Sequence, residues 1–306
     1  MKRSHRLTPL LVALGLILAS CSSAGIAATV NGSDISDEKV LSLSTEPLDG
    51  PVIPGPNFRN LLLNAIFTEA MVTGAEQDFG LAGLDSKQSI DAFVQSATPQ
   101  ETDVLRSISE NSELSESAVE LVAVQLLTRR SVQEELAQDP EIITSVWEED
   151  RDLLVQACAR HIVLATEAEA EVVQGRIESG EGFSDLVAEV SLDTQSPGGA
   201  FPCPLNPSSL GDPFRTVLST APVGEVTAPV QSRLGWHVIL VDSRETPATF
   251  EAFAEDPALW MPASVLDAEW TTWLNDTLAE SSIDVRSQIG EWVSTSDGIL
   301  PPPASP

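Results

Sequence analysis

The chain has 306 residues and a formal net charge of −30, from 46 acidic and 16 basic residues. This balance excludes a nucleic-acid-binding protein, because phosphates need basic partners. It is typical of a soluble, self-repelling protein outside the cell, and we interpret the charge as a solvated surface rather than an acidic binding site. An apolar fraction of 42% is enough to form hydrophobic cores, and the length predicts one or two domains.

The first residues have the composition of an export signal, predicted to occupy residues 1–20. A positive start precedes an apolar run over residues 7–18, which is too short to span a membrane comfortably. Residues 18–21 resemble a bacterial lipobox with Cys21 as the lipidated residue. The alternative is an ordinary signal peptide in which Cys21 is incidental. We expect a lipoprotein signal peptide, a small-residue linker over 21–28 and a protein tethered outside the membrane.

Helical patterns dominate the chain before residue 158. Helices are predicted over residues 58–79 and 86–94, from Thr98-Pro99, over 117–138 with a capping box from Ser117 to Glu120, and from Asp139-Pro140. None of these segments carries an apolar run as long as a membrane span.

The C-terminal segment follows a different pattern after residue 245. A capping box from Ser264 to Asp267 predicts a helix, and Trp270 and Trp273 share one of its faces. We interpret these tryptophans and Trp260 as core residues, with an exposed client-binding surface as the alternative. Further on, residues 283–286 and 290–293 read as a strand pair, and residues 300–306 as a disordered tail.

The central stretch is framed by two short, β-branched apolar runs, at residues 158–164 and 235–241. Such runs predict buried strands. Each run carries one histidine near its start, His161 and His237. Between them the predicted order is two helices, a loop, a helix start and a strand, which together indicate a small α+β unit. The predicted segments are residues 167–179, 183–190, 191–199, the start at Asp212-Pro213, and 227–231.

Five motifs in this stretch resemble the parvulin family of peptidyl-prolyl cis–trans isomerases. They are His-Ile-Val-Leu at 161–164, Phe-Ser-Asp-Leu-Val at 183–187, Ser-Leu-Asp at 191–193 with Gly-Gly at 198–199, Gly-Glu-Val-Thr-Ala-Pro-Val at 224–230, and Gly-Trp-His-Val-Ile at 235–239. The family's Gly-Gly-Asp-Leu-Gly reads here Gly-Gly-Ala-Phe-Pro, which is a departure. The resemblance covers somewhat under a third of the chain.

The resemblance implies a set of site residues. His161 and His237 would form a buried histidine pair, and Asp193 would face the substrate carbonyl. An apolar pocket for the proline ring would be formed by the remaining positions, Phe201, Leu210 and Phe214. No cofactor or metal is implied.

The wider chain resembles foldases of the SurA/PrsA type. This implies an α+β fold class in which a helical chaperone-like domain, residues 29–157 plus 246–299, is built from both chain ends. The parvulin domain, residues 158–245, would be inserted into it. A helix with two tryptophans near the C-terminus is the natural partner to close the core of the N-terminal helices.

Two functions follow from this resemblance. The first is an extracytoplasmic isomerase or foldase that acts on X–Pro bonds of exported proteins. The second is a holdase chaperone whose parvulin domain binds peptides without significant catalysis. In both cases the expected partners are unfolded or partly folded exported proteins and the membrane through the N-terminal lipid, with no nucleic acid.

The cysteines lead to one further expectation. With Cys21 consumed by lipid, Cys158 and Cys203 are the two thiols left, in an exported protein where disulfides persist. Cys158 lies at the mouth of the first strand, and Cys203 lies two residues after Phe201, which the resemblance places on the same side of the pocket. We expect a Cys158–Cys203 disulfide, with two buried, reduced cysteines as the alternative.

Overall fold

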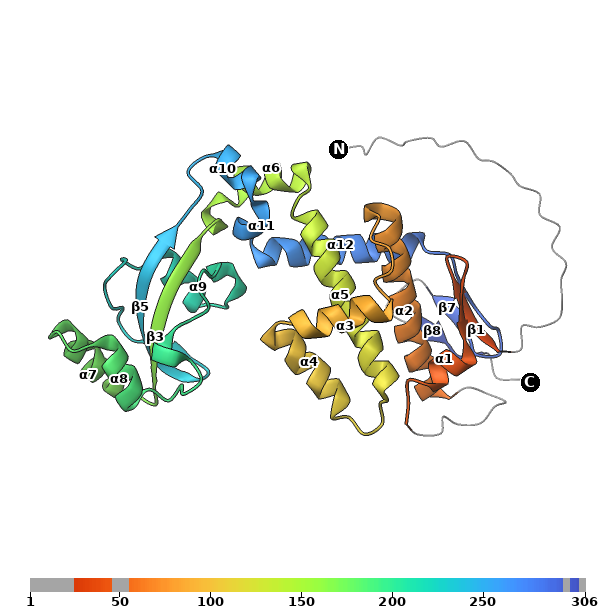
Figure 1. The fold of residues 1–306 in the computed structure, drawn as a ribbon, viewed down its shortest axis with the longest axis horizontal. Helices are drawn as coiled ribbons and strands as arrows, with labels where there is room; N and C mark the ends of the chain where they lie inside the picture. Colours follow the sequence, from red (N-terminus) through yellow and green to blue (C-terminus); the bar gives the residue numbers. More distant parts are fainter. Residues whose placement is uncertain (1–24, 46–54, 294–297, 303–306) are drawn as a thin grey trace.

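The computed structural model describes residues 25–45, 55–293 and 298–302. The predicted signal peptide and Cys21 therefore lie outside the described residues. Figure 1 shows a helical part and a second part built around a sheet. Within the described residues, no helix combines the length and apolar composition that crossing a bilayer requires.

The helical part packs its longest helices against one another. Met71 and Ala75 of one helix, Val132 and Leu136 of a second, and Trp270 of a third share one buried cluster. The helices of this part are α1 (Asp37–Leu41), α2 (Pro56–Phe79), α3 (Lys87–Ser96), α4 (Pro99–Ser109), α5 (Glu116–Leu136), α6 (Pro140–Glu149) and α12 (Ala263–Glu280). Trp270 is thus a core residue, and Trp273 contacts it with ring centroids 5.1 Å apart.

The two ends of the chain meet in one small sheet of order β2-β1-β6. Its strands are β1 (Ile26–Val30), β2 (Ser33–Ser36) and β6 (Ile283–Val285). Ala28 pairs with Val285, and Arg286 bonds the Asp37 carboxylate. The linker predicted over residues 21–28 is therefore wrong at its end, because Ile26–Ala28 belong to β1, which pairs with β2 and, from Ala28 on, with β6.

A second pair of strands changes two further predictions. β7 (Glu291–Val293) pairs with β8 (Gly298–Leu300). The sequence predicted that β6 and β7 would pair with each other, and this prediction is wrong. The disordered tail predicted from residue 300 is wrong at its start, since Leu300 belongs to β8 and pairs with Glu291 of β7. Both errors concern partners that the local pattern could not identify.

Several helix starts lie where the polar caps predict. Thr98 and Glu101 form a capping box at α4, and the Asp139 side chain caps α6. Ser115 caps α5, so Ser117 lies within the first turn and its predicted capping box is wrong. The box predicted at Ser264 is wrong for a similar reason, because α12 is already helical at Ala263.

The second part is an antiparallel sheet of order β3-β5-β4 with helices around it. Gln156 of β3 pairs with Glu245 of β5, so the chain enters and leaves this part at neighbouring positions. The bounds are β3 (Gln156–Leu164), α7 (Glu167–Glu178), α8 (Phe183–Val190), α9 (Phe214–Thr220), β4 (Val230–Ser232) and β5 (Gly235–Glu245), followed by α10 (Phe250–Glu255) and α11 (Pro257–Trp260). The fold class expected from the sequence, an α+β unit between helical segments, is confirmed.

The sheet has two differently covered faces because successive strand residues point to opposite sides. Ile162, Leu164 and Val238 pack against α7 and α8. Ala159 and Ile239 lie on the opposite face, where they pack with α9 and with the loop that precedes it. The second face also carries the two histidines, and it positions the candidate site.

Candidate active site

The histidine pair is created by the strand register. In the antiparallel β3–β5 pair, His161 lies opposite Ile239 and His237 lies opposite Val163. The two histidines are therefore diagonal neighbours on one face. Their Nδ1 atoms are 3.4 Å apart, and both residues are buried, His237 to 1% exposure.

The hydrogen bonds of the pair fix one consistent proton order. An ionised Asp193 only accepts, so His161 Nε2–H donates to its Oδ2 over 2.9 Å. His161 Nδ1 is then an acceptor for Nδ1–H of His237. That tautomer leaves His237 Nε2 to accept from Ser232 Oγ at 2.7 Å. Ser232 Oγ in turn accepts from the Leu234 backbone N–H at 3.0 Å.

Asp193 is positioned by a loop that is bound to β3. The Leu192 N–H donates to the Val163 carbonyl over 2.8 Å, and the Val163 N–H donates to Ser191 Oγ over 3.2 Å. The Asp193 side chain nevertheless keeps 23% exposure, so it is accessible from solvent.

Donated hydrogen bonds keep this carboxylate charged. The Ser196 hydroxyl donates to Asp193 Oδ2 over 2.6 Å, and the Gln195 backbone N–H donates to Oδ1 over 2.8 Å. These bonds hold the pKa of the Asp193 carboxyl well below its ordinary range, against the opposing effect of burial. Asp193 is therefore an anion near neutral pH.

Burial has the opposite consequence for His237. Desolvation, helped by the neighbouring His161, lowers its pKa from 6.5 to about 4, against the attraction of Asp193. His237 is therefore neutral near pH 7, which agrees with the proton order described above.

This shift predicts a pH dependence of stability. Between pH 6.5 and 4 the unfolded chain binds a proton at residue 237 that the folded chain does not, so the free energy of unfolding falls as pH falls. The slope approaches about 1.4 kcal/mol per pH unit at most. Denaturant titrations at pH 7, 5.5 and 4.5 should show a steeper fall in the wild type than in His237→Gln. Equal slopes would contradict the assignment.

The predicted pocket residues surround the histidines. The Phe201 ring lies 4.4 Å from the His161 ring, and the Phe214 ring 4.8 Å from that of His237, between centroids. The two phenylalanines meet edge to face at 6.1 Å. Leu210 belongs to the same partly buried cluster. All the residues expected at the site thus gather on one face of the sheet.

The loop that carries Phe201 is tied to β3. The Phe201 N–H donates to the Ala159 carbonyl over 3.0 Å, and Leu205 exchanges backbone hydrogen bonds with Ala157. Between these contacts a disulfide joins Cys158 to Cys203, with Cα atoms 4.9 Å apart.

One local prediction near the pocket is wrong. Asp212 does not cap α9, whose N-cap position is occupied by Pro213 without a side-chain bond. The Asp212 carboxylate instead accepts from the side chains of Arg215 and Thr216. The helix still begins at Phe214, so the pocket residue keeps its predicted element.

Two serines of the hydrogen-bond network were missed by the sequence reasoning. Ser196 follows Asp193 by three residues, a spacing at which loop serines commonly bond a preceding Asp side chain. Ser232 ends β4, where the hairpin turn brings it back to His237. The first had a recognisable local signal. The second depends on the hairpin register.

Comparison with known proteins agrees with this geometry. The family described as "Rotamase: PPIC-type PPIASE domain" matches residues 162–243. This part of the chain is similar to that family, and we refer to it below as the rotamase domain. The parvulin resemblance read from the motifs is thereby confirmed.

Two curated relatives match at about one third identity. The chain is 32% identical over 143 residues to Chaperone SurA of Pseudomonas aeruginosa, a match that covers 42% of this chain and 33% of the relative. It is 32% identical over 114 residues to Foldase protein PrsA 2 of Listeria monocytogenes, covering 37% of this chain and 38% of the relative. The chain thus spans about a third of the length of these relatives.

One solved foldase structure is also similar to this chain. The foldase protein PrsA from Streptococcus pneumoniae is 14% identical, with a TM-score of 0.49, covering 77% of this chain and 90% of that one.

Proposed function

We propose that this protein is an extracytoplasmic peptidyl-prolyl cis–trans isomerase that assists the folding of exported proteins. One observation carries the proposal. A charged Asp193, hydrogen-bonded to a buried histidine pair, lies on the same sheet face as the apolar cluster of Phe201 and Phe214.

The reaction needs no nucleophile and no cofactor. Rotation about the peptide bond meets a barrier of about 18–20 kcal/mol because resonance gives the C–N bond double-bond character. A catalyst must bind the twisted amide better than the planar one. The rings of Phe201 and Phe214, with Leu210, would hold the proline ring by apolar contact and leave the preceding carbonyl free to rotate.

Asp193 would supply the electrostatic difference. In the planar amide, resonance places partial negative charge on the carbonyl oxygen, and twisting withdraws that charge. A carboxylate facing this oxygen repels the planar form more than the twisted one, which lowers the barrier. The donors at Ser196 and Gln195 keep Asp193 ionised for this role.

The histidines would position Asp193 rather than react. His161 donates to Asp193 and is itself oriented by His237, which Ser232 holds in one tautomer. This chain of hydrogen bonds fixes the carboxylate beside the pocket while its outer surface stays exposed to a substrate.

The helical domain and the chain's N-terminus complete the proposal. The domain built from both chain ends would hold unfolded clients near the isomerase domain, residues 158–245. Lipidation of Cys21 would place both outside the membrane. Cys21→Ser should release the protein into the medium or leave it unprocessed, as fractionation and mass spectrometry would show. Unchanged membrane retention would refute the anchor.

An isomerisation assay on a proline tetrapeptide tests the proposed activity. We expect Asp193→Ala and Phe214→Ala each to lower kcat/KM at least tenfold, because one removes the anion and the other the pocket wall. Asp185→Ala, an exposed carboxylate in α8 of the same domain, is the matched control and should leave the rate unchanged. Circular dichroism would verify that each variant keeps its fold.

The same assay separates isomerase from holdase. Wild-type protein that binds unfolded clients but has no activity above background would establish the holdase alternative. In that case Asp193→Ala would also leave client binding unaffected.

A further inference from the structure

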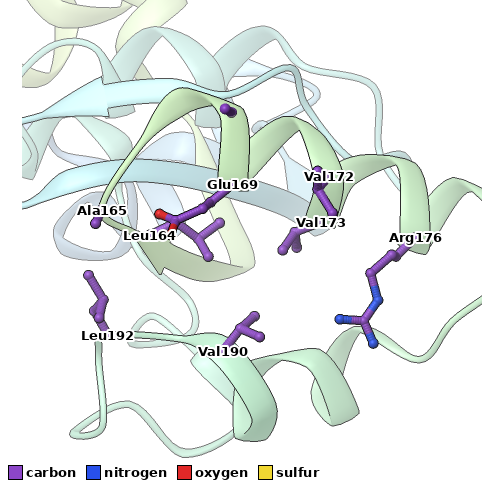
Figure 2. A pocket seen from close by; sticks show the side chains of 9 residues that line it. Leu164, Ala165, Glu169, Val172, Val173, Arg176, Val190 and Leu192 are labelled. Atoms are coloured by element: carbon purple, nitrogen blue, oxygen red, sulfur yellow. The ribbon is translucent and has the colours of Figure 1, made fainter.

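A second concave surface of the rotamase domain lies outside the candidate active site. It is a groove of about 550 Å³ between α7, α8 and the end of β3, lined mainly by Leu164, Val172, Val173, Val190 and Leu192. In Figure 2, Leu164 and Val173 approach it from one side and Val190 and Leu192 from the other. Its volume is within the range of about 300–1,000 Å³ that is typical of ligand sites.

The groove leaves apolar side chains in water. Val172 is 64% exposed and Leu192 60% exposed, among the most exposed large apolar residues in the described chain. Figure 1 shows α7 and α8 at the end of the molecule away from the helical domain, so that domain does not cover them. Exposed apolar surface gathered in one concavity is characteristic of an interaction site.

The charged side chains at the groove are engaged within the domain. Glu169 accepts from the Thr166 backbone and hydroxyl in the capping box of α7. Arg176 bonds Glu181 and also Glu189 of α8, which links the two walls. These bonds hold the groove in a preformed shape, and they favour an occupant that contributes apolar side chains.

The surroundings of the groove are strongly acidic. Residues 167–190, which contain α7 and α8, hold seven carboxylates and a single basic side chain, Arg176. Arg176 is already neutralised by its two glutamates. An occupant with positive charge beside its apolar residues would therefore be attracted, and an acidic one repelled.

The groove borders the loop that carries Asp193. Leu192 lines the groove and is followed directly by Asp193, and the Leu192 N–H bonds β3 at Val163. A strand advances about 3.3 Å per residue. The edge of the groove at Leu192 is one residue from Asp193, a separation that a short extended segment of a client covers.

We propose that this groove binds an apolar segment of an unfolded client, flanked by Lys or Arg, next to the prolyl bond. The inference deepens the proposed function, on which it rests. The rotamase domain would then contact one client chain at two places, the active site and the groove. Clients would be selected by apolar and basic residues near proline as well as by proline itself.

A proline-free peptide tests the groove independently of isomerisation. The probe is a fluorescein-labelled Lys-Lys-Leu-Leu-Ala-Leu-Lys-Lys, titrated with the full chain and followed by anisotropy. We expect Val172→Gln and Leu192→Gln each to weaken binding about tenfold. Val223→Gln, an exposed valine of the same domain away from the groove, should bind like wild type. A Glu-flanked analogue should bind at least tenfold more weakly, and added salt should reduce the difference.

Two results would overturn the inference. Equal affinity of wild type, Val172→Gln and Val223→Gln would place binding elsewhere. Sedimentation velocity would show whether the wild type is a dimer. A wild-type dimer that becomes monomeric in Val172→Gln would mean that the groove binds a second copy of the chain. Tetrapeptide isomerisation by the wild type is measured alongside. If the wild type showed no isomerisation, the proposed activity would be refuted. Peptide binding by the wild type and the variants would still show whether the groove is a binding site.

Discussion

Loss of the Cys158–Cys203 disulfide should lower the free energy of unfolding of the rotamase domain by about 4 kcal/mol. The bond spans 45 residues of sequence, and a cross-link of this length removes that amount of chain entropy from the unfolded state. It also joins the start of β3 to the loop that carries Phe201. We therefore expect the pocket to loosen, and kcat/KM to fall, under the same conditions.

Hydrogen exchange at the amides of β3 and β5 would measure this effect within the whole chain, because these amides exchange through opening of the rotamase domain. Wild type in reductant and the Cys158→Ser/Cys203→Ser double variant should show the same loss of protection. Reductant should then have no further effect on the double variant. Unchanged protection on reduction would contradict the prediction.

Local signals explain how much of this fold the sequence could predict. The strands around His161 and His237 and the helix starts at Thr98 and Asp139 depend on side-chain pattern and capping within a few residues. The elements that carry the candidate site residues were predictable because motif order fixed them. The register then brings the histidines to adjacent positions on one face.

The errors arise where the partner is distant in sequence. β6 pairs with β1, more than 250 residues away, although a neighbouring segment matched the local strand pattern equally well. Ser232 depends on the β4–β5 register to reach His237. The α7–α8 groove likewise depends on the packing of two helices whose exposed Val172 resembles any surface residue in the sequence.

The second large effect concerns the two glycines that follow the Asp193 loop. Gly199 has φ +74°, and a Cβ there would lie 2.2 Å from the His161 carbonyl oxygen and 3.0 Å from Val187 Cγ2. Neither the β3 backbone nor the packed α8 can withdraw without disturbing the site. Gly198 has a similar φ of +63°, but the nearest atom to its Cβ would be Ser184 Oγ at 4.0 Å. An alanine at Gly198 would therefore suffer backbone strain alone, whereas an alanine at Gly199 would suffer the same strain and a steric clash.

Gly198→Ala should cost about 1–2 kcal/mol of unfolding free energy, the usual cost of a left-handed conformation for an L-residue. Gly199→Ala should carry the same strain plus about 1–3 kcal/mol for the forced displacement of β3 or α8. Because the displaced carbonyl belongs to His161, Gly199→Ala should also reduce tetrapeptide isomerisation, while Gly198→Ala should change it little. Denaturant titration gives the two free energies. Equal costs for the two variants would mean that β3 yields freely at His161, and that the loop does not hold the histidine pair in place.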